Sequence, residues 1–378
     1  MELQLTETQA QIRDVARRFA QEKLAPRARE RDRQSIFPEG ELRELGALGL
    51  LGINVPEAHG GAAAGVVAYA AAIAELAEAC ASTTVAVAVT NMVAEQVARF
   101  GSEAQRRETL PELVSGQAIA GAFALSESHC GSDAAALLTR ARRDGSDWVL
   151  DGQKLWITSG DRAGWLIVFA RSGGPGAKGI SAFLIRGGTP GLTAGPPEHK
   201  MGLHGSTTVP LVFSECRVPG SALLGAEGEG FKVAMSALDG GRIGISAQAI
   251  GVLRACLAAS RRYAGDRKAF GAPIGSFQAI QWKLAAMATD LAAAELLCFR
   301  AAALKDQGKP FTREASMSKL FCTEAANRHA LEAVQIHGGY GYIDEFPVER
   351  YLRDARVQTL YEGTSEIQRK VIAREILR

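Results

Sequence analysis

The period of the apolar residues changes twice along the 378-residue chain, and this constrains the fold more than any other feature of the sequence. From residue 6 to about 116, apolar residues recur every three or four positions, which is the spacing of amphipathic helices. Thr6 and Gln9 match a capping box at the start of the first helix. Between about 118 and 225 the apolar residues form short β-rich runs separated by Asp-Gly and Gly-Gly-Pro turns. From residue 230 onward long helical patterns return.

These three zones predict a multidomain α and β protein. We expect an N-terminal α-helical domain at residues 1–117, a middle antiparallel β domain at 118–226 and a C-terminal four-helix bundle domain at 227–378. The predicted helices lie at about 40–48, 65–81, 85–100 and 103–113, and then at about 231–263, 276–306 and 312–336, followed by a shorter closing pair.

The charge balance and the apolar stretches argue against two classes of partner. Lys and Arg number 43 and Asp and Glu number 41, so there is no basic surplus to attract nucleic acid or an anionic membrane. The longest apolar stretch, near 62–81, is rich in alanine and contains Glu75 and Glu78, so we interpret it as a buried helix of a soluble protein. We therefore expect no nucleic-acid partner, no membrane insertion and a small ligand.

The six cysteines are far apart and form no CxxC pair, which fits neither a zinc site nor a dense disulfide framework. Reduced thiols are typical of the cytoplasm, and the charged, helix-patterned N-terminus shows no secretion signal. We expect a cytoplasmic protein without a bound metal. The glycine patterns of two common nucleotide sites, GxGxxG after a strand and GxxxxGK followed by Ser or Thr, are absent.

A loop signal at residues 361–366 separates the last two helical patterns and places the Glu362 carboxylate beside Gly363. A glycine lets a ligand reach backbone N–H groups. Removal of a proton α to a thioester requires a base at one end and hydrogen-bond donors at the carbonyl oxygen, where negative charge develops. The loop also fits a structural role, with Gly363 as a helix C-cap and Thr364 as the N-cap of the last helix. Both roles can hold together.

Two segments of the middle zone are candidates for binding a polar ring system. At residues 123–133 a strand opens into a polar loop with N–H and hydroxyl groups suited to a polar ring edge. Trp156, Ile157 and Thr158 end a strand, and their aromatic face could stack on a flavin or fill the inner face of the sheet.

Two segments of the last zone are candidates for binding a pyrophosphate. Arg267 supplies a guanidinium, with Gln278 nearby in sequence, and the adjacent Gly338 and Gly339 let the backbone approach a ligand. An exposed basic loop and a helix C-cap would explain the same residues. His337 has no partner at metal-ligand spacing, so we interpret it as a packing residue.

Taken together, these segments resemble the acyl-CoA dehydrogenase family over essentially the whole chain. Seven motifs occur in the family's order: FALSE with CGSDAA, DGQKLWIT, GFKVAMSALDGGRIGISAQAIG, DRKAFGAPIGSFQ, VQIHGGYGY, VERYLRDAR and LYEGTSEIQR. The resemblance implies the acyl-CoA dehydrogenase fold, with its helical domain, β domain and four-helix bundle. It also implies assembly as a homotetramer, or sometimes a dimer, and FAD bound between the β domain and the bundle.

The resemblance implies a set of FAD-binding residues, carried over motif by motif. They are Phe123, Leu125, Ser126, Ser132, Trp156, Ile157, Thr158, Arg267, Phe270, Gln278, Gln335, Ile336, His337, Gly338, Gly339, Thr364, Ser365 and Glu366. In the family the pyrophosphate and adenosine half of FAD is typically held across a subunit boundary.

The resemblance further implies FAD-dependent α,β-dehydrogenation of a short-chain, butyryl-type acyl-CoA to a trans-2-enoyl-CoA. Glu362 would abstract the α-proton, and the β-hydride would pass to flavin N5. Some branches place the base on a bundle helix, at the position that is Gly241 here, so the sequence selects Glu362. The electrons would leave through an electron-transferring flavoprotein. The residues contacting the CoA thioester would be Ser132, Asp239, Arg242 and Gly363.

One departure from the family pattern lies in the loop near the flavin. Family members usually have Pro and small residues where this chain has Ser128, His129 and Cys130, and Ser128 does not restrain φ as a proline would. An acyl-CoA oxidase is the nearest alternative, although oxidases of this superfamily are usually longer. A DNA-associated, flavin-bearing branch would need an extended basic C-terminal region. The acyl group stays open between short straight, short branched and medium chains.

Overall fold

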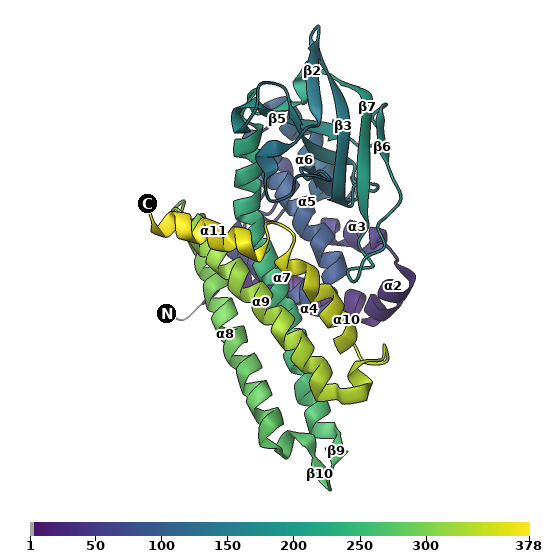
Figure 1. The fold of residues 1–378 in the computed structure, drawn as a ribbon, viewed down its shortest axis with the longest axis vertical. Coiled ribbons are helices and arrows are strands. Elements are labelled where there is room, and N and C mark those ends of the chain that lie inside the picture. Colours follow the sequence, from purple (N-terminus) through teal and green to yellow (C-terminus); the bar gives the residue numbers. More distant parts are fainter. Residues whose placement is uncertain (1–3) are drawn as a thin grey trace.

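The computed structural model describes residues 4–378, which form an elongated molecule with a β-sheet layer at one end and long helices at the other (Figure 1). The first helix begins at the predicted capping box: the Thr6 hydroxyl accepts from the Gln9 N–H at 3.3 Å, and the Gln9 side chain accepts from the Thr6 N–H at 3.0 Å. The helices before the sheet are α1 (Glu7–Phe19), α2 (Ala28–Gln34), α3 (Glu39–Ala47), α4 (Gly65–Ala79), α5 (Ala81–Phe100) and α6 (Glu103–Val114).

The sheet is mostly antiparallel, and its strands follow the order β6-β7-β3-β2-β4-β5-β8, with β1 paired to β4. The strands are β1 (Gly121–Ala124), β2 (Arg140–Asp144), β3 (Asp147–Thr158), β4 (Trp165–Arg171), β5 (Ile180–Arg186), β6 (Leu192–Ala194), β7 (Thr208–Val218) and β8 (Leu223–Leu224). The predicted antiparallel arrangement is wrong in one part, because β1 runs parallel to β4, and β2 touches β4 in parallel at one residue pair. The long segment that includes the β2–β3 hairpin supplies the crossover that a parallel pair requires.

Both faces of the sheet are covered, as the alternation along β4 shows. Trp165, Ile167 and Phe169 pack into the core shared with the helices, whereas Leu166 and Val168 pack into a second core on the other face. The sheet is therefore anchored to the helical part by one face, and the loops at its edge can meet the bundle.

The C-terminal part contains three long helices, α7 (Gly230–Asp266), α8 (Gln278–Asp306) and α9 (Thr312–His337). The two-stranded β9–β10 hairpin (Lys268–Ala269 and Ala272–Pro273) joins α7 to α8 at the far end of the molecule (Figure 1). The remaining bundle member is the predicted closing pair, α10 (Val348–Arg356) and α11 (Ser365–Ile376), which both pack on α9.

Helix α7 is the central element of the molecule and contacts α4, α5, α8 and α9. Among the described residues it is the one helix whose length and mean hydropathy, 1.5, would suffice to cross a membrane. However, 83% of that apolar stretch is buried inside the protein. Its apolar character is thus accounted for by packing against other helices.

Candidate active site

The predicted loop signal forms the tight connection between α10 and α11. Glu362 and Gly363 both have positive φ, 51° and 92°, and Thr364 caps α11 by accepting from the Ile367 N–H at 3.3 Å. A left-handed conformation is uncommon for a glutamate, and such strain clusters at functional sites. The expected N-cap role of Thr364 is therefore present, whereas the C-cap expected at Gly363 is wrong, because α10 ends at Arg356 with Val357 as its C-cap. The turn leaves the Glu362 side chain free to point into the protein.

The Glu362 carboxyl group lies against α7 at Gly241. A Cβ atom added at Gly241 would overlap Glu362 Oε2, so only glycine leaves room for this carboxyl position. Oε2 is shielded from solvent and has no hydrogen-bond partner among residues 4–378. Burial raises the pKa of Glu362 to about 7, while the charges of Lys319 and Arg242 partly oppose this rise. The result is a carboxyl group that can accept or release a proton near neutral pH.

The structure brings the predicted thioester-contacting residues Asp239, Arg242 and Gly363 to the same place. Buried Arg242 pairs with Asp239 one helical turn earlier, and Asp239 also accepts from the Thr312 hydroxyl of α9 at 2.8 Å. Arg242 thus keeps a local counter-ion and also contributes positive charge close to Glu362. Next to them, Ser365 is buried and Glu366 is exposed.

Lys319 of α9 belongs to this site and was missed by sequence reasoning. It is fully buried, and its Nζ donates to the Gly363 carbonyl at 2.8 Å. Burial lowers its pKa to about 7 against the opposing charge of Glu362. The one available signal was its position in the apolar stripe of its helix, between Ala315 and Cys322, where a lysine is out of place.

The segments predicted to line a ring system come together at the C-terminal end of β3. The β3–β7 ladder is irregular between Lys154 and Ile157, and Trp156 adopts a φ of 59° there. This irregularity turns Trp156 outward, so that 56% of its surface is exposed, while Ile157 stays in the sheet core and Thr158 is half-buried. The alternative prediction, that these residues fill the inner face of the sheet, is therefore correct for Ile157 and wrong for Trp156. Within β3, the Leu155 N–H donates to the carbonyl of Ser126 in the loop after β1 at 2.9 Å.

The loop after β1 is held by a buried ion pair that sequence reasoning also missed. Glu127 Oε1 accepts from Lys154 Nζ at 2.7 Å and from the Thr139 N–H at 3.0 Å, and Oε2 accepts from the Leu138 N–H at 2.7 Å. Lys154 also donates to the Leu125 carbonyl at 3.1 Å. These bonds join the two ends of the loop and orient its backbone. Of the predicted ring-contacting residues, Phe123 is half-buried, Leu125 is buried and Ser132 is exposed.

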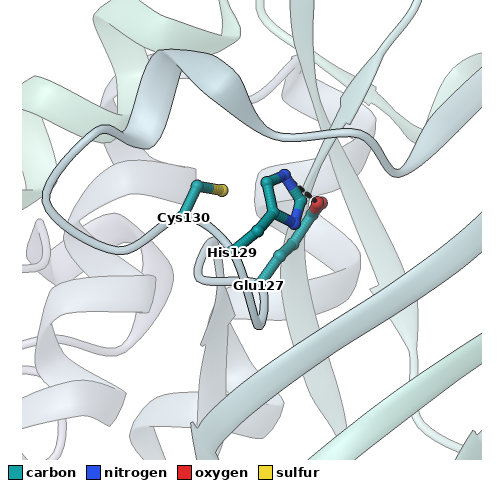
Figure 2. Close-up of side chains that lie close together, drawn as sticks. All are labelled: Glu127, His129 and Cys130. Atoms are coloured by element: carbon teal, nitrogen blue, oxygen red, sulfur yellow. Dashed lines mark ion pairs between the residues drawn. The ribbon is translucent and has the colours of Figure 1, made fainter.

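Figure 2 shows Glu127, His129 and Cys130 close together in this loop, with a His129–Glu127 separation of 3.7 Å. Their donor atoms all lie within 4.8 Å of one another, the spacing of a metal site. However, a cation would meet the Lys154 ammonium that already neutralises Glu127, and His129 Nε2 contacts the Ala136 carbonyl at 3.2 Å. These contacts indicate that the three side chains hold the loop in place and do not form a metal centre.

The predicted pyrophosphate-binding residues lie elsewhere, beside the β9–β10 hairpin at the far end of the molecule (Figure 1). A cavity of about 520 Å³ is lined by Arg267, Ile336, His337, Gly338 and Gly339 together with neighbouring aromatic residues. Around both glycines there is open space where a side chain would be. Arg267 and Gln335 are exposed, so a ligand can reach them.

His337 has the packing role expected of it. It is buried, stacks on Tyr263 at 4.2 Å between ring centroids, and contacts the Ala333 carbonyl through Nδ1. Phe270 is almost fully exposed at 98%, with a φ of 50°, and Gln278 is exposed at the start of α8. Apart from residues 364–366 at the start of α11, the residues predicted to bind the cofactor therefore form two surfaces within one chain, one at the end of β3 and one beside the β9–β10 hairpin.

Comparison with known proteins agrees with this architecture along the whole chain. Three family models match in succession: the acyl-CoA dehydrogenase N-terminal domain at residues 6–117, the middle domain at 122–216 and the C-terminal domain at 228–377. The mouse (Mus musculus) mitochondrial short-chain specific acyl-CoA dehydrogenase is 48% identical over 378 residues, which cover 100% of this chain and 92% of that protein.

Two solved structures have nearly the same fold as this chain. The three-dimensional structure of butyryl-CoA dehydrogenase from Megasphaera elsdenii is 42% identical, covers 100% of both chains and superposes with a TM-score of 0.98. A chain from a structure described as the electron transferring flavoprotein of Acidaminococcus fermentans gives the same identity, coverage and TM-score.

Proposed function

Because this chain belongs to the acyl-CoA dehydrogenase family, we propose that it oxidises short-chain acyl-CoA thioesters to trans-2-enoyl-CoA products, with Glu362 as the base. The chain is an FAD-dependent oxidoreductase that dehydrogenates acyl-CoA. The observation that carries the proposed role of Glu362 is its shielded, unpartnered carboxyl oxygen beside Gly241 and Gly363.

The residues at both predicted cofactor surfaces fit FAD. Trp156 is turned outward near the end of β3 and offers an apolar face to a ring system. At the far end, exposed Arg267 and the open backbone of Gly338 and Gly339 suit a pyrophosphate. When bound, FAD supplies the hydride acceptor at its flavin N5.

The separation of the two cofactor surfaces supports an oligomer. The β9–β10 hairpin lies far from the sheet in one chain (Figure 1), which supports a second copy whose β9–β10 end would meet the end of β3 around one cofactor. We propose a homotetramer with this arrangement, and domain boundaries near residues 117 and 226.

The chain itself supplies the base and its surroundings. Glu362 takes the α-proton on its shielded oxygen, and its raised pKa makes it a stronger base than an exposed glutamate. The carbonyls of Glu362 and Gly363 accept from buried Gln368, and that of Gly363 also from Lys319. Because a trans peptide places N–H opposite C=O, the N–H groups of Gly363 and Thr364 face away from these donors and would be available to a thioester oxygen.

We propose further that the electrons pass to an electron-transferring flavoprotein and that the enzyme works in the cytoplasm. The superposition on a chain from a structure described as an electron transferring flavoprotein supports the first point. The preference for short acyl chains is supported by the names of the mouse and Megasphaera relatives. We expect the reduced enzyme to pass electrons to an electron-transferring flavoprotein much faster than to oxygen. Equal rates with the two acceptors would favour an oxidase.

The test of the proposed base is Glu362→Gln, with Glu345→Gln at an exposed position as the control. The amide preserves shape and removes basicity, so this variant should keep FAD and bind butyryl-CoA but lose nearly all flavin reduction in an anaerobic mixing experiment. Reduction at a near wild-type rate would exclude Glu362 as the base. A panel of acyl-CoAs on the wild-type enzyme should give the highest kcat/KM with short straight chains.

A further inference from the structure

A buried lysine lies beneath the loop that carries Glu362. Lys319 has no exposed surface, and the Gly363 carbonyl is the one hydrogen-bond partner of its Nζ among residues 4–378. An ammonium group has three donors, and burying it without full pairing is costly. A lysine retained in such a position therefore needs a reason other than stability.

The hydrogen bond alone does not supply that reason. Gln368 Nε2 already donates to the same Gly363 carbonyl at 2.9 Å and lies 3.4 Å from the Glu362 carbonyl. A neutral amide thus holds the two left-handed residues of the turn from one side. What Lys319 adds to this arrangement is a positive charge.

The Lys319 charge acts in a site with few compensating groups. Glu362 Oε2 has no hydrogen-bond partner, and Arg242, the other cation near it, is already paired with Asp239. The ionisable groups that interact electrostatically with Glu362 or Lys319 come from the loop itself and from four helices: Tyr361 from the loop, Tyr69 from α4, Arg242 from α7, Glu324 from α9 and Glu366 from α11. Of these, Glu366 is exposed.

We propose that Lys319 is a positioning residue whose buried ammonium keeps the Glu362 carboxyl group ionised, and so ready to take a proton, at neutral pH. This inference rests on the proposed function of Glu362 as the base. Burial pushes the pKa of Glu362 upward, and Lys319 is the largest charge that opposes this. Its own pKa is lowered to about 7, because burial outweighs the attraction to Glu362. Arg242 alone would leave the carboxyl group protonated to a higher pH.

The experiment compares Lys319→Met and Lys319→Gln with the wild-type FAD-bound enzyme. Both remove the charge, and the Gln variant keeps a hydrogen-bond donor. Loss of a neighbouring opposite charge should raise the pKa of Glu362 by about one unit or more. Infrared spectra of the substrate-free holoenzyme measure this directly, through the stretch of the protonated carboxyl group that Glu362→Gln lacks. Flavin reduction by butyryl-CoA should then fall roughly tenfold at acidic pH and recover at alkaline pH.

Lys283→Met is the matched control, because Lys283 pairs with Glu332 between α8 and α9 and lies outside the site. It should leave the infrared titration unchanged. An unshifted Glu362 titration in both Lys319 variants would overturn the proposal, as would a shift in Lys319→Met alone, since the hydrogen bond would then be responsible. The infrared result does not depend on turnover. It therefore stands apart from the Glu362→Gln activity test, which decides whether Glu362 is the base.

Discussion

Replacing Lys154 by methionine should loosen the loop after β1 and weaken FAD binding. In the wild type, the 2.7 Å ion pair between Lys154 and Glu127 is almost fully buried, with side-chain exposures of 0% and 4%. The pair connects the Leu125 carbonyl at one end of the loop to the Leu138 and Thr139 N–H groups at the other. One substitution thus affects the whole segment that is proposed to contact the flavin ring.

The expected magnitude follows from the burial of the pair. Removing one partner leaves an uncompensated charge, which costs about 3–5 kcal/mol in buried pairs. Native proteins are stable by only about 5–15 kcal/mol, so the variant should lose a large part of its stability. The positive charge of Lys154 and the hydrogen bonds to Glu127 hold the pKa of this carboxyl below its usual range despite burial. Without Lys154, that pKa should rise.

The assay combines the FAD-to-chain ratio after gel filtration with the midpoint of thermal unfolding. Lys178→Met, at an exposed position in the same part of the chain, is the control and should match the wild type. Adding Glu127→Gln to Lys154→Met should restore much of the stability, because no buried charge then remains. If Lys154→Met keeps its FAD and unfolds within a degree or so of the wild type, a change of about 1 kcal/mol at most, the loop does not depend on the pair.

Three further predictions concern the catalytic and cofactor surfaces. The rate of flavin reduction should rise with pH through about 7, because Glu362 must lose its proton before it can act as a base; a rise centred near the ordinary value of 4.5 would contradict the burial argument. Arg267→Ala should weaken FAD retention more than it slows the holoenzyme that remains, measured as flavin content against kcat, and full flavin content with a large loss of kcat would refute this role. The double variant Glu362→Gly with Gly241→Glu should recover some of the activity that Glu362→Gly loses, because a side chain at 241 enters the space that the Glu362 carboxyl group now occupies. If the double variant folds and binds FAD but recovers no activity, the two positions do not serve the same carboxyl site.

The expectations that depend on neighbouring residues could be derived from the sequence. The change from helical to β to helical periodicity, the Thr6 and Gln9 capping box and the Thr364 cap follow from interactions within about one turn of chain, and all are present. The same holds for the loop at Glu362 and Gly363, whose left-handed backbone is a local property. The sequence also shows that a glycine, Gly241, precedes Arg242, but it does not show that this glycine contacts Glu362.

What only the tertiary structure decided are the features that depend on packing between distant segments. Lys319 looks like any lysine of an amphipathic helix until α9 is packed beneath the α10–α11 connection, 44 residues away along the chain. The Glu127–Lys154 pair spans 27 residues and forms because the loop after β1 folds back on β3. Trp156 is exposed because the ladder with β7 becomes irregular at that residue. Ionisation and exposure depend on which atoms surround a side chain, and those atoms come from elements that periodicity and local caps do not place relative to one another.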